Sequence, residues 1–327
     1  MQEVSQPANV YWAEVDPTAP NNSHAYSLEL VGANKRVLEL GPAAGHVTKA
    51  LVANGCRVVG VEVDADAASL VEPVAERVVV GDLSDPAVVA SAIDDERFDV
   101  VLGGDVLEHL PDPLRVLRAC RGALKPGGYV VLSLPNIAHA DVKLQLLAGR
   151  FPYRDTGLLD RTHLHFFTLA SIQQMLCDAG FLMVDLRRVV MPVFHTELAI
   201  DPADVPDDVR ALVLADAESE TYQFIVRGVV HDGDAEVAGL AGRVLALEHD
   251  LDTERTRRDA EREAARNEAA DLQARLDESV NSAQGFERQS QEHERQSQEH
   301  EGHVKALLST RSYRLMAPLR AAFHRRS

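Results

Sequence analysis

The sequence predicts an α/β protein in which a doubly wound, seven-stranded sheet is followed by a long helical tail. Short apolar runs alternate with helical patterns through the first 230 residues. The first run leads directly into the small-residue turn Gly41-Pro-Ala-Ala-Gly45 and then into a helical pattern. From Ala238 onward the composition shifts to Glu, Arg, Gln and Ala, with no proline until Pro318. These three observations separate a folded domain from a tail without a core.

Five apolar runs have the length and composition of buried parallel strands. They lie at 37–40, 58–62, 78–80, 98–102 and 129–134. Helical stretches between them predict the crossovers of a doubly wound sheet. Two further runs, 181–190 and 221–230, need no long helix between them, which predicts a terminal antiparallel hairpin. Between these two runs, a polar loop at 201–208 leads into a short helix expected over 209–217.

Composition divides the chain into a folded domain over 1–235, a helical, coiled-coil-like stalk over 236–303 and a basic amphipathic segment over 304–327. The formal net charge of −18 argues against a nucleic-acid partner, because phosphate contacts need clustered Lys and Arg. The three cysteines form no CxxC pair, which predicts reduced thiols without a disulfide framework or zinc site. No signal sequence or long apolar stretch is present, so we expect a cytoplasmic protein.

Glu62 ends the second apolar run, twenty-one residues after Gly41, where an acid accepts hydrogen bonds from ribose hydroxyls. The pair predicts an adenosine site. A dinucleotide fingerprint would place glycines at positions 41, 43 and 46, but the chain has Gly41, Ala43 and His46. Because His46 would crowd a pyrophosphate at the helix start, a nicotinamide or flavin cofactor fits poorly.

S-adenosylmethionine fits this turn better, because its methionine part carries an amine, a carboxylate and a sulfonium in place of phosphates. Gly41 and Gly45 flank two alanines and can wrap a smaller group, and Glu39 can meet an ammonium. After the third run, Asp82 can accept a hydrogen bond from an adenine amino group while Leu83 packs on the ring. The alternative is that Asp82 or Asp85 caps the next helix.

A further turn follows the fourth run, where Gly103 and Gly104 permit close backbone approach to a ligand and Asp105 comes next. Together with the earlier motifs, this segment resembles a class I S-adenosylmethionine-dependent methyltransferase, a Rossmann-like fold. The resemblance rests on the order and spacing of residues 36–46, 57–64, 81–83, 98–110 and 124–135.

The resemblance covers about residues 20–190 and implies the strand order 3-2-1-4-5-7-6. It also implies that Glu39, Gly41 and Gly45 cradle the methionine end, that Glu62 binds the ribose and that Asp82 binds the adenine. Ala43 replaces a usual glycine but adds only a methyl group, so cofactor binding is expected to survive.

Segments 134–140, 147–153 and 157–168 resemble a bacterial branch of this class that is associated with glycan and cell-surface polysaccharide assembly. The branch implies O-methylation of a sugar or glycan hydroxyl. Two alternatives stay open. The acceptor could be a small non-sugar molecule such as a quinol or a natural-product hydroxyl, or the domain could be a non-catalytic scaffold that acts through its coiled coil.

Methyl transfer to a neutral hydroxyl needs alignment and removal of a proton, for which a histidine is the natural base. His163 and His165 follow Asp160 in a connection expected at the ligand end of the sheet, and Asp160 could orient an imidazole. Equally, Asp160-Arg-Thr-His could be a self-satisfied turn in which His163 caps the next helix. His109 either reaches the acceptor or lines the cofactor pocket.

Two further predictions concern residues on the same face of the sheet. His24 and Tyr26 could fold over the cofactor as a lid or simply lie on the surface. Asp105 and Asp160 could hold a magnesium ion that binds two hydroxyls, but no tight acidic cluster supports this, and no metal site is predicted.

The tail carries apolar residues at helical spacing, and the heptad 287–293 is repeated without change as 294–300. It is predicted to be a self-associating stalk or, alternatively, a charged helix that is marginal alone. No acid follows Glu301, and the basic C-terminus is predicted to meet an anionic membrane surface at the inner face or a glycosyltransferase partner. The stretch 309–320 resembles a segment at the ends of polysaccharide-assembly enzymes.

Overall fold

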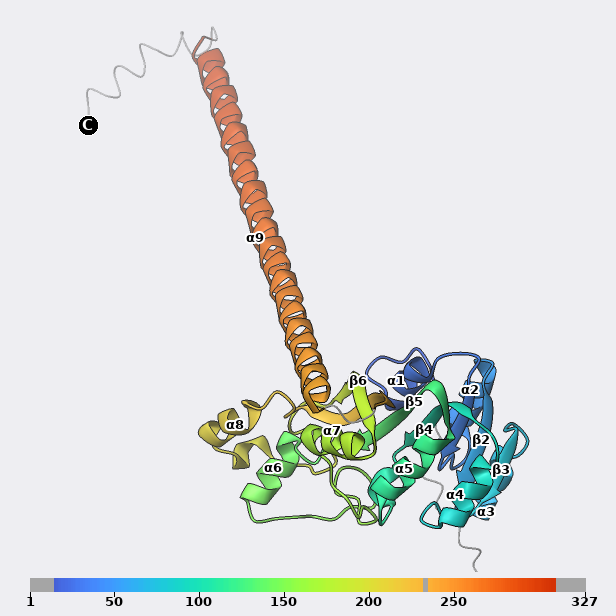
Figure 1. The fold of residues 1–327 in the computed structure, drawn as a ribbon. Helices are drawn as coiled ribbons and strands as arrows, with labels where there is room; N and C mark the ends of the chain where they lie inside the picture. The colour runs from blue at the N-terminus through green and yellow to red at the C-terminus, as the bar shows by residue number, and fades with distance from the viewer. Residues whose placement is uncertain (1–14, 232–234, 310–327) are drawn as a thin grey trace, which may run out of the picture. The chain divides into compact units, whose positions relative to one another are not determined.

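A computed structural model describes residues 15–231 and 235–309, and its elements are labelled in Figure 1. The chain divides into two compact units, Met1–His249 and Asp250–Ser327. The first contains a seven-stranded sheet with helices on both faces, and the second consists, in its described part, of one long helix. The basic residues predicted at the C-terminus, apart from Lys305, lie outside the described residues.

All seven predicted apolar runs form strands of a single sheet, in the order β3-β2-β1-β4-β5-β7-β6. They are β1 (Arg36–Leu40), β2 (Arg57–Glu62), β3 (Arg77–Val80), β4 (Phe98–Gly104), β5 (Leu124–Pro135), β6 (Phe181–Val190) and β7 (Thr221–Val230). Strands β1 to β5 pair in parallel, whereas β7 pairs antiparallel with both β5 and β6. The predicted order and the antiparallel hairpin are confirmed. β5 starts earlier than predicted because Leu124 already pairs with Phe98 across an irregularity in the ladder.

The helices of the first unit cover both faces of the sheet, because successive strand residues point to opposite sides. Leu38 and Leu40 pack with α4, α5 and α7 on one face, whereas Val37 packs with α1 and α2 on the other. The helices are α1 (Ser23–Val31), α2 (His46–Ala53), α3 (Ala65–Val71), α4 (Pro86–Ile93), α5 (Pro113–Ala123), α6 (Ala140–Leu147), α7 (Leu169–Asp178) and α8 (Asp207–Leu214), with short 3-10 turns η1 (Leu107–His109) and η2 (Pro202–Asp204).

Side-chain caps fix where the helices begin. Asp85 accepts from the Ala87 amide at 2.9 Å at the start of α4, and Thr168 with Ser171 forms a reciprocal capping box at the start of α7. The helix predicted over 209–217 is shifted to 207–214. It begins earlier because Pro206 supplies its N-cap, and it ends before Asp216, whose carboxylate accepts from the Glu218 amide in a turn.

The segment between β6 and β7, which includes α8, packs against α6. Figure 1 labels both helices. Asp141 of α6 is fully buried and accepts hydrogen bonds from the Thr196 hydroxyl at 2.6 Å and from the Phe194 amide at 2.8 Å. These bonds fix the segment against α6, which follows β5 in the chain.

The tail is a single helix, α9 (Ala235–Ser309), as the sequence predicts. The seven described side chains of its apolar stripe are 46–67% exposed: Leu240, Val244, Leu247, Leu251, Leu272, Leu276 and Val280. Within the described residues, no helix is both long enough and apolar enough to span a membrane.

Candidate functional site

A cavity of about 920 Å³ opens at the carboxyl ends of the parallel strands. This edge of a doubly wound sheet is where ligands bind, because the strand order reverses there and the connecting loops diverge. Most predicted site residues line the cavity, but Gly45, Gly103 and His165 do not. The predicted cofactor acids therefore share one cavity with Asp160, His109 and His163.

The turn after β1 has three residues in the left-handed backbone region, Gly41 (φ +66°), Ala43 (φ +46°) and Gly45 (φ +76°). A Cβ on Gly41 would lie 2.6 Å from Cγ2 of Val106, so only glycine fits there. Gly45 lies behind the cavity wall and shapes the turn through its amide, which donates to Pro42 O at 2.8 Å. Ala43 tolerates the conformation at a cost of about 1 kcal/mol.

Two acids flank this turn, as predicted. Glu62 accepts the Ala43 amide on one oxygen at 2.8 Å and the Asp64 amide on the other at 3.0 Å. A carboxylate offers about four acceptor positions, so capacity remains for two ribose hydroxyls. Glu39 is only 3% exposed and accepts from the Thr48 hydroxyl at 2.6 Å.

Burial raises the pKa of Glu39 to about 7, with the Glu62 charge adding to the rise and the Thr48 hydrogen bond opposing it. A cation beside Glu39 would restore its ionised form, because an opposite charge favours the carboxylate. The pair therefore fits the ammonium and the hydroxyls of S-adenosylmethionine.

Both residues that were expected to contact adenine line the cavity. Asp85 rather than Asp82 caps α4, and Asp82 accepts the Ser84 amide at 2.7 Å while lining the cavity. Leu83 lines the same wall. A Cβ added to Gly104 would have no other atom within 4 Å, so the backbone at Gly104 is open to a ligand. Gly103 instead faces Leu132 within the sheet.

Asp105 lines the cavity in a left-handed conformation (φ +52°). It accepts hydrogen bonds from the Gln223 side chain and from the Ser133 hydroxyl. Burial raises the pKa of Asp105, and the nearby His24 opposes the rise. Burial also lowers the pKa of His24, which lines the cavity from α1 in agreement with a covering role.

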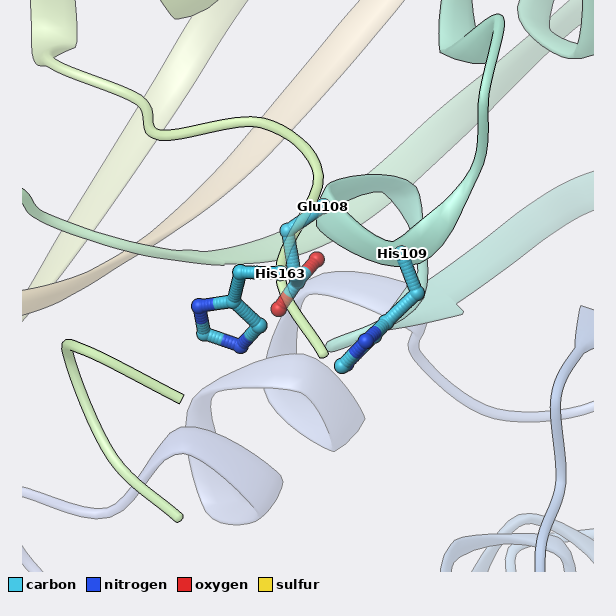
Figure 2. A group of neighbouring side chains, drawn as sticks. All are labelled: Glu108, His109 and His163. Atoms are coloured by element: carbon cyan, nitrogen blue, oxygen red, sulfur yellow. The ribbon is translucent and has the colours of Figure 1, made fainter. Parts of the chain in front are cut away.

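Glu108, His109 and His163 also line the cavity, and their side chains lie close together in Figure 2. Glu108 and His109 come from η1 and His163 from the loop before α7, and one potential ligand atom of each lies within 4.8 Å of the others. Burial raises the pKa of Glu108 well above its usual range, and Asp105 adds to the effect. Burial lowers the pKa of His163, which favours a neutral imidazole able to accept a proton.

Asp160 serves its own turn rather than an imidazole. It accepts from the Thr162 amide at 2.7 Å and from the Thr162 hydroxyl at 2.6 Å. The alternative prediction is a turn in which Asp160 pairs with Arg161 and His163 caps the next helix. Asp160 is indeed bound within its own turn, but Arg161 pairs with Asp155 at 2.7 Å and Thr168 caps α7. His165 lies outside the cavity lining, with Nε2 3.3 Å from Pro111 O and its ring stacked on Phe167.

Sequence reasoning missed Glu108, Tyr222 and Gln223 among the cavity-lining residues. Glu108 belongs to the Asp105-Val-Leu-Glu-His motif, but its inward direction depends on the 3-10 turn, which the motif alone does not specify. Tyr222 and Gln223 arrive from β7, almost ninety residues after β5 in the chain, and no local pattern marks them.

A mixed sheet in this order, with acids near the carboxyl ends of β1 and β2 at one cavity, defines the class I, S-adenosylmethionine-dependent methyltransferase fold. A family model described as a methyltransferase domain matches residues 11–186, and the chain belongs to that family.

Several known proteins are similar to this chain. The ubiquinone biosynthesis O-methyltransferase of Psychrobacter arcticus is 31% identical over 170 residues, which is 50% of this chain and 65% of the relative. That of a Cereibacter sphaeroides strain is 40% identical over 162 residues, covering 47% and 63%. The chain thus spans just under two thirds of the length of these relatives. A solved SAM-dependent methyltransferase from Archaeoglobus fulgidus has 17% identity and a TM-score of 0.44, covering 63% of this chain and 94% of its own.

Proposed function

We propose that the protein transfers the methyl group of S-adenosylmethionine to a hydroxyl oxygen of a small, non-sugar acceptor such as a quinol or a natural-product phenol. The observation that carries the proposal is a single cavity that holds both the Glu39 and Glu62 acids and the histidine pair. Similarity to ubiquinone biosynthesis O-methyltransferases supports a ring hydroxyl as the acceptor.

The residues fit the cofactor part by part. Glu39 would bind the ammonium, Glu62 the ribose hydroxyls and Asp82 the adenine amino group. Gly41 and Gly104 allow the backbone to approach. When bound, the cofactor supplies a methyl group on a sulfonium, whose displacement needs an acceptor oxygen held in line behind the carbon.

A flat ring as the acceptor is supported by apolar members of the cavity lining, which include Leu110, Pro111, Pro135 and the ring of Tyr222.

Proton removal is assigned to the histidine pair. As the oxygen takes the methyl group, its proton passes to a neutral imidazole, for which the lowered pKa of His163 is suited. His109 packs edge-on against His163, with ring centroids 4.8 Å apart. The products are a methyl ether, the neutral sulfide and an imidazolium that releases its proton to water.

Methyl-labelled S-adenosylmethionine, incubated with the full chain and an acceptor panel, tests this function. The panel contains quinols, catechols, nucleotide sugars and lipid-linked glycans. We expect label on a quinol or catechol. Label found only on sugars would overturn the acceptor class and favour the polysaccharide branch that segments 134–168 resemble. Binding of cofactor without transfer to any member would favour the scaffold alternative.

A further inference from the structure

We propose that α9 pairs with a second copy of this chain along residues 265–307, with the two helices parallel and in register. The pairing surface is one stripe of the helix that carries no Asp, Glu, Lys or Arg, and we call it the uncharged seam. This pairing is independent of the proposed methyl transfer, because it uses only residues of the tail.

The helix is continuous over this segment, so its heptad positions can be assigned. α9 runs without a break in Figure 1. Leu272 and Leu276 are four residues apart, which is the step from position d to position a of a heptad. Continued in both directions, this register defines the thirteen residues of the uncharged seam: Ala265, Ala269, Leu272, Leu276, Ser279, Ala283, Phe286, Ser290, His293, Ser297, His300, Val304 and Leu307.

Charged residues are confined to the rest of the helix. Residues 265–307 contain fourteen Asp, Glu, Lys and Arg residues, and all fourteen lie at the other five heptad positions. The repeated heptads 287–293 and 294–300 follow the same rule, because only their serines and histidines fall on the seam. A fully solvated helix has no need to keep one stripe free of charge over about six heptads. The distribution therefore indicates a face that is buried against a partner.

Taken alone, this part of α9 has little to stabilise it. Four large apolar residues of the seam are 43–75% exposed: Leu272, Leu276, Phe286 and Val304. Gly285 and Gly302 lie inside the helix, where a glycine costs roughly 1 kcal/mol relative to alanine. Arg295 lies 3.7 Å from Glu292 and 3.6 Å from Glu299, but exposed ion pairs of this kind contribute little. A long helix of this kind gains most of its stability by packing its seam.

The residues that flank the seam decide the orientation of the pair. Position e is glutamate at 287, 294 and 301, whereas position g is glutamine at 289 and 296. In a parallel pair, position g of one helix faces position e of the partner's next heptad, so each glutamine amide can donate to a carboxylate. In an antiparallel pair, position e faces position e, which sets glutamate against glutamate. The flanking charges therefore favour the parallel pair.

The polar part of the seam fixes the register. In a parallel, in-register pair each seam residue faces its own copy, so His293 meets the partner's His293 and His300 meets the partner's His300. A slip by one heptad would set Phe286 against an imidazole, which is costly because a buried polar group then lacks a partner. In register, position d packs beside position e of the partner, where Glu294 and Glu301 can accept the imidazole N–H groups.

Disulfide cross-linking of the full chain tests the orientation and the register. Ser279→Cys and Ser297→Cys are made separately in a Cys177→Ser background, because Cys177 is half-buried whereas the other two cysteines are buried. In a parallel, in-register pair each new cysteine faces its own copy, near the ~4.4–6.8 Å between Cα atoms that a disulfide needs. We expect cross-linked dimers from both variants. Asn281→Cys, at the outer position f, is the control and should not cross-link.

Two outcomes of this experiment would contradict the proposal. An antiparallel pair brings at most one position onto its own copy, so cross-linking at only one of the two serines would overturn the parallel orientation. Cross-linking at Asn281→Cys as strong as at the seam positions would overturn the seam itself.

Charge placed in the seam tests the surface by a second route. Ser290→Glu with Ser297→Glu puts two acids per chain at position a, and the control Gln291→Glu with Gln298→Glu adds the same charge at the outer position b. By sedimentation of the full chain, we expect a dimeric wild type. The dissociation constant should rise at least ~10-fold in the seam variant and stay within about 3-fold in the control.

Thermal unfolding of the first unit checks that both charge variants are folded. A monomeric wild type, or equal dissociation of the two charge variants, would overturn the proposal. Absence of methyl transfer from a dimeric protein would instead defeat the proposed function and leave the pairing standing.

Discussion

Ala43 holds a left-handed backbone (φ +46°) at the tip of the cofactor turn, where the position favours glycine. We predict that Ala43→Gly raises the free energy of unfolding by roughly 0.5 kcal/mol, because relief of the strain exceeds the added freedom of the unfolded chain. Urea unfolding measures the change. Gly41→Ala is the matched control and should destabilise, because its Cβ would lie 2.6 Å from Cγ2 of Val106. A lower unfolding free energy in Ala43→Gly would contradict the strain argument.

Glu39 should make cofactor binding depend on pH. Its pKa in the folded protein is about 7, raised by burial from 4.5. Between these values the folded protein binds a proton that the unfolded chain has released, so this group's contribution to stability is lost as pH rises through 7. An ammonium ligand needs ionised Glu39, so S-adenosylmethionine should bind nearly ~10-fold more tightly at pH 8 than at pH 6.

Calorimetry at the two pH values checks this expectation. Glu39→Gln should bind more weakly and lose most of the pH dependence. If the variant kept the full dependence of the wild type, the titration would belong to another group.

Single residues also mark the limit of sequence reasoning. Glu39, Gly41, Glu62 and Asp82 could be predicted because they lie at or within two residues of the carboxyl ends of strands, and the edge of a parallel sheet fixes where such residues lie. His163 and His165 looked equivalent in sequence. Only the loop path, tied to β5 by the bridge between Asn136 and Phe167, brings one into the cavity and leaves the other outside.

At the scale of elements, Glu197 ties the segment between β6 and β7 to the loop that carries His163. It accepts the Leu158 amide at 2.6 Å and the Tyr222 hydroxyl at 3.1 Å. We predict that Glu197→Ala lowers kcat/KM for the acceptor by about 10-fold, equal to ~1.4 kcal/mol, with cofactor affinity unchanged. Steady-state kinetics and calorimetry give the two values. Equal losses in kcat/KM for the acceptor and in cofactor affinity would show a general loss of folding instead.

The apolar stripe of the long helix is exposed. We propose that α9 self-associates, because exposed Leu and Val recur at heptad-like spacing along it. Sedimentation of the full chain should show a dimer or larger species. Leu272→Lys together with Leu276→Lys should shift it toward monomer, while the off-stripe control Gln273→Lys should not. A monomeric wild type at high concentration would remove the proposal.

The sequence predicted these elements unequally well. All seven strands were predicted from the sequence, because a buried strand is a short, continuous apolar run. The ends of α8 were missed, because Pro206 and the turn at Asp216 set them through local hydrogen bonds and backbone restriction rather than periodicity. A helical stalk was predictable from composition, whereas its association depends on a second chain.

For the whole molecule, sequence reasoning predicted one site for the cofactor residues and for His109, Asp160 and His163, but it missed Glu108, Tyr222 and Gln223. The cofactor half is built from successive strand ends, so its residues follow one another along the chain. The acceptor half combines α1, η1, the loop before α7 and β7, which only the folded sheet brings together. The basic C-terminus and its expected membrane or glycosyltransferase partner stay a prediction.

Calorimetric titration of the full chain with S-adenosylmethionine tests the central claim most directly. The account predicts one site per chain, with affinity reduced more than about 10-fold in Glu62→Ala, because the ribose loses two hydrogen bonds to a charged group. Circular dichroism confirms that the variant is folded. Absence of binding in the wild type, or equal affinity in wild type and Glu62→Ala, would contradict the assignment of this cavity to the cofactor.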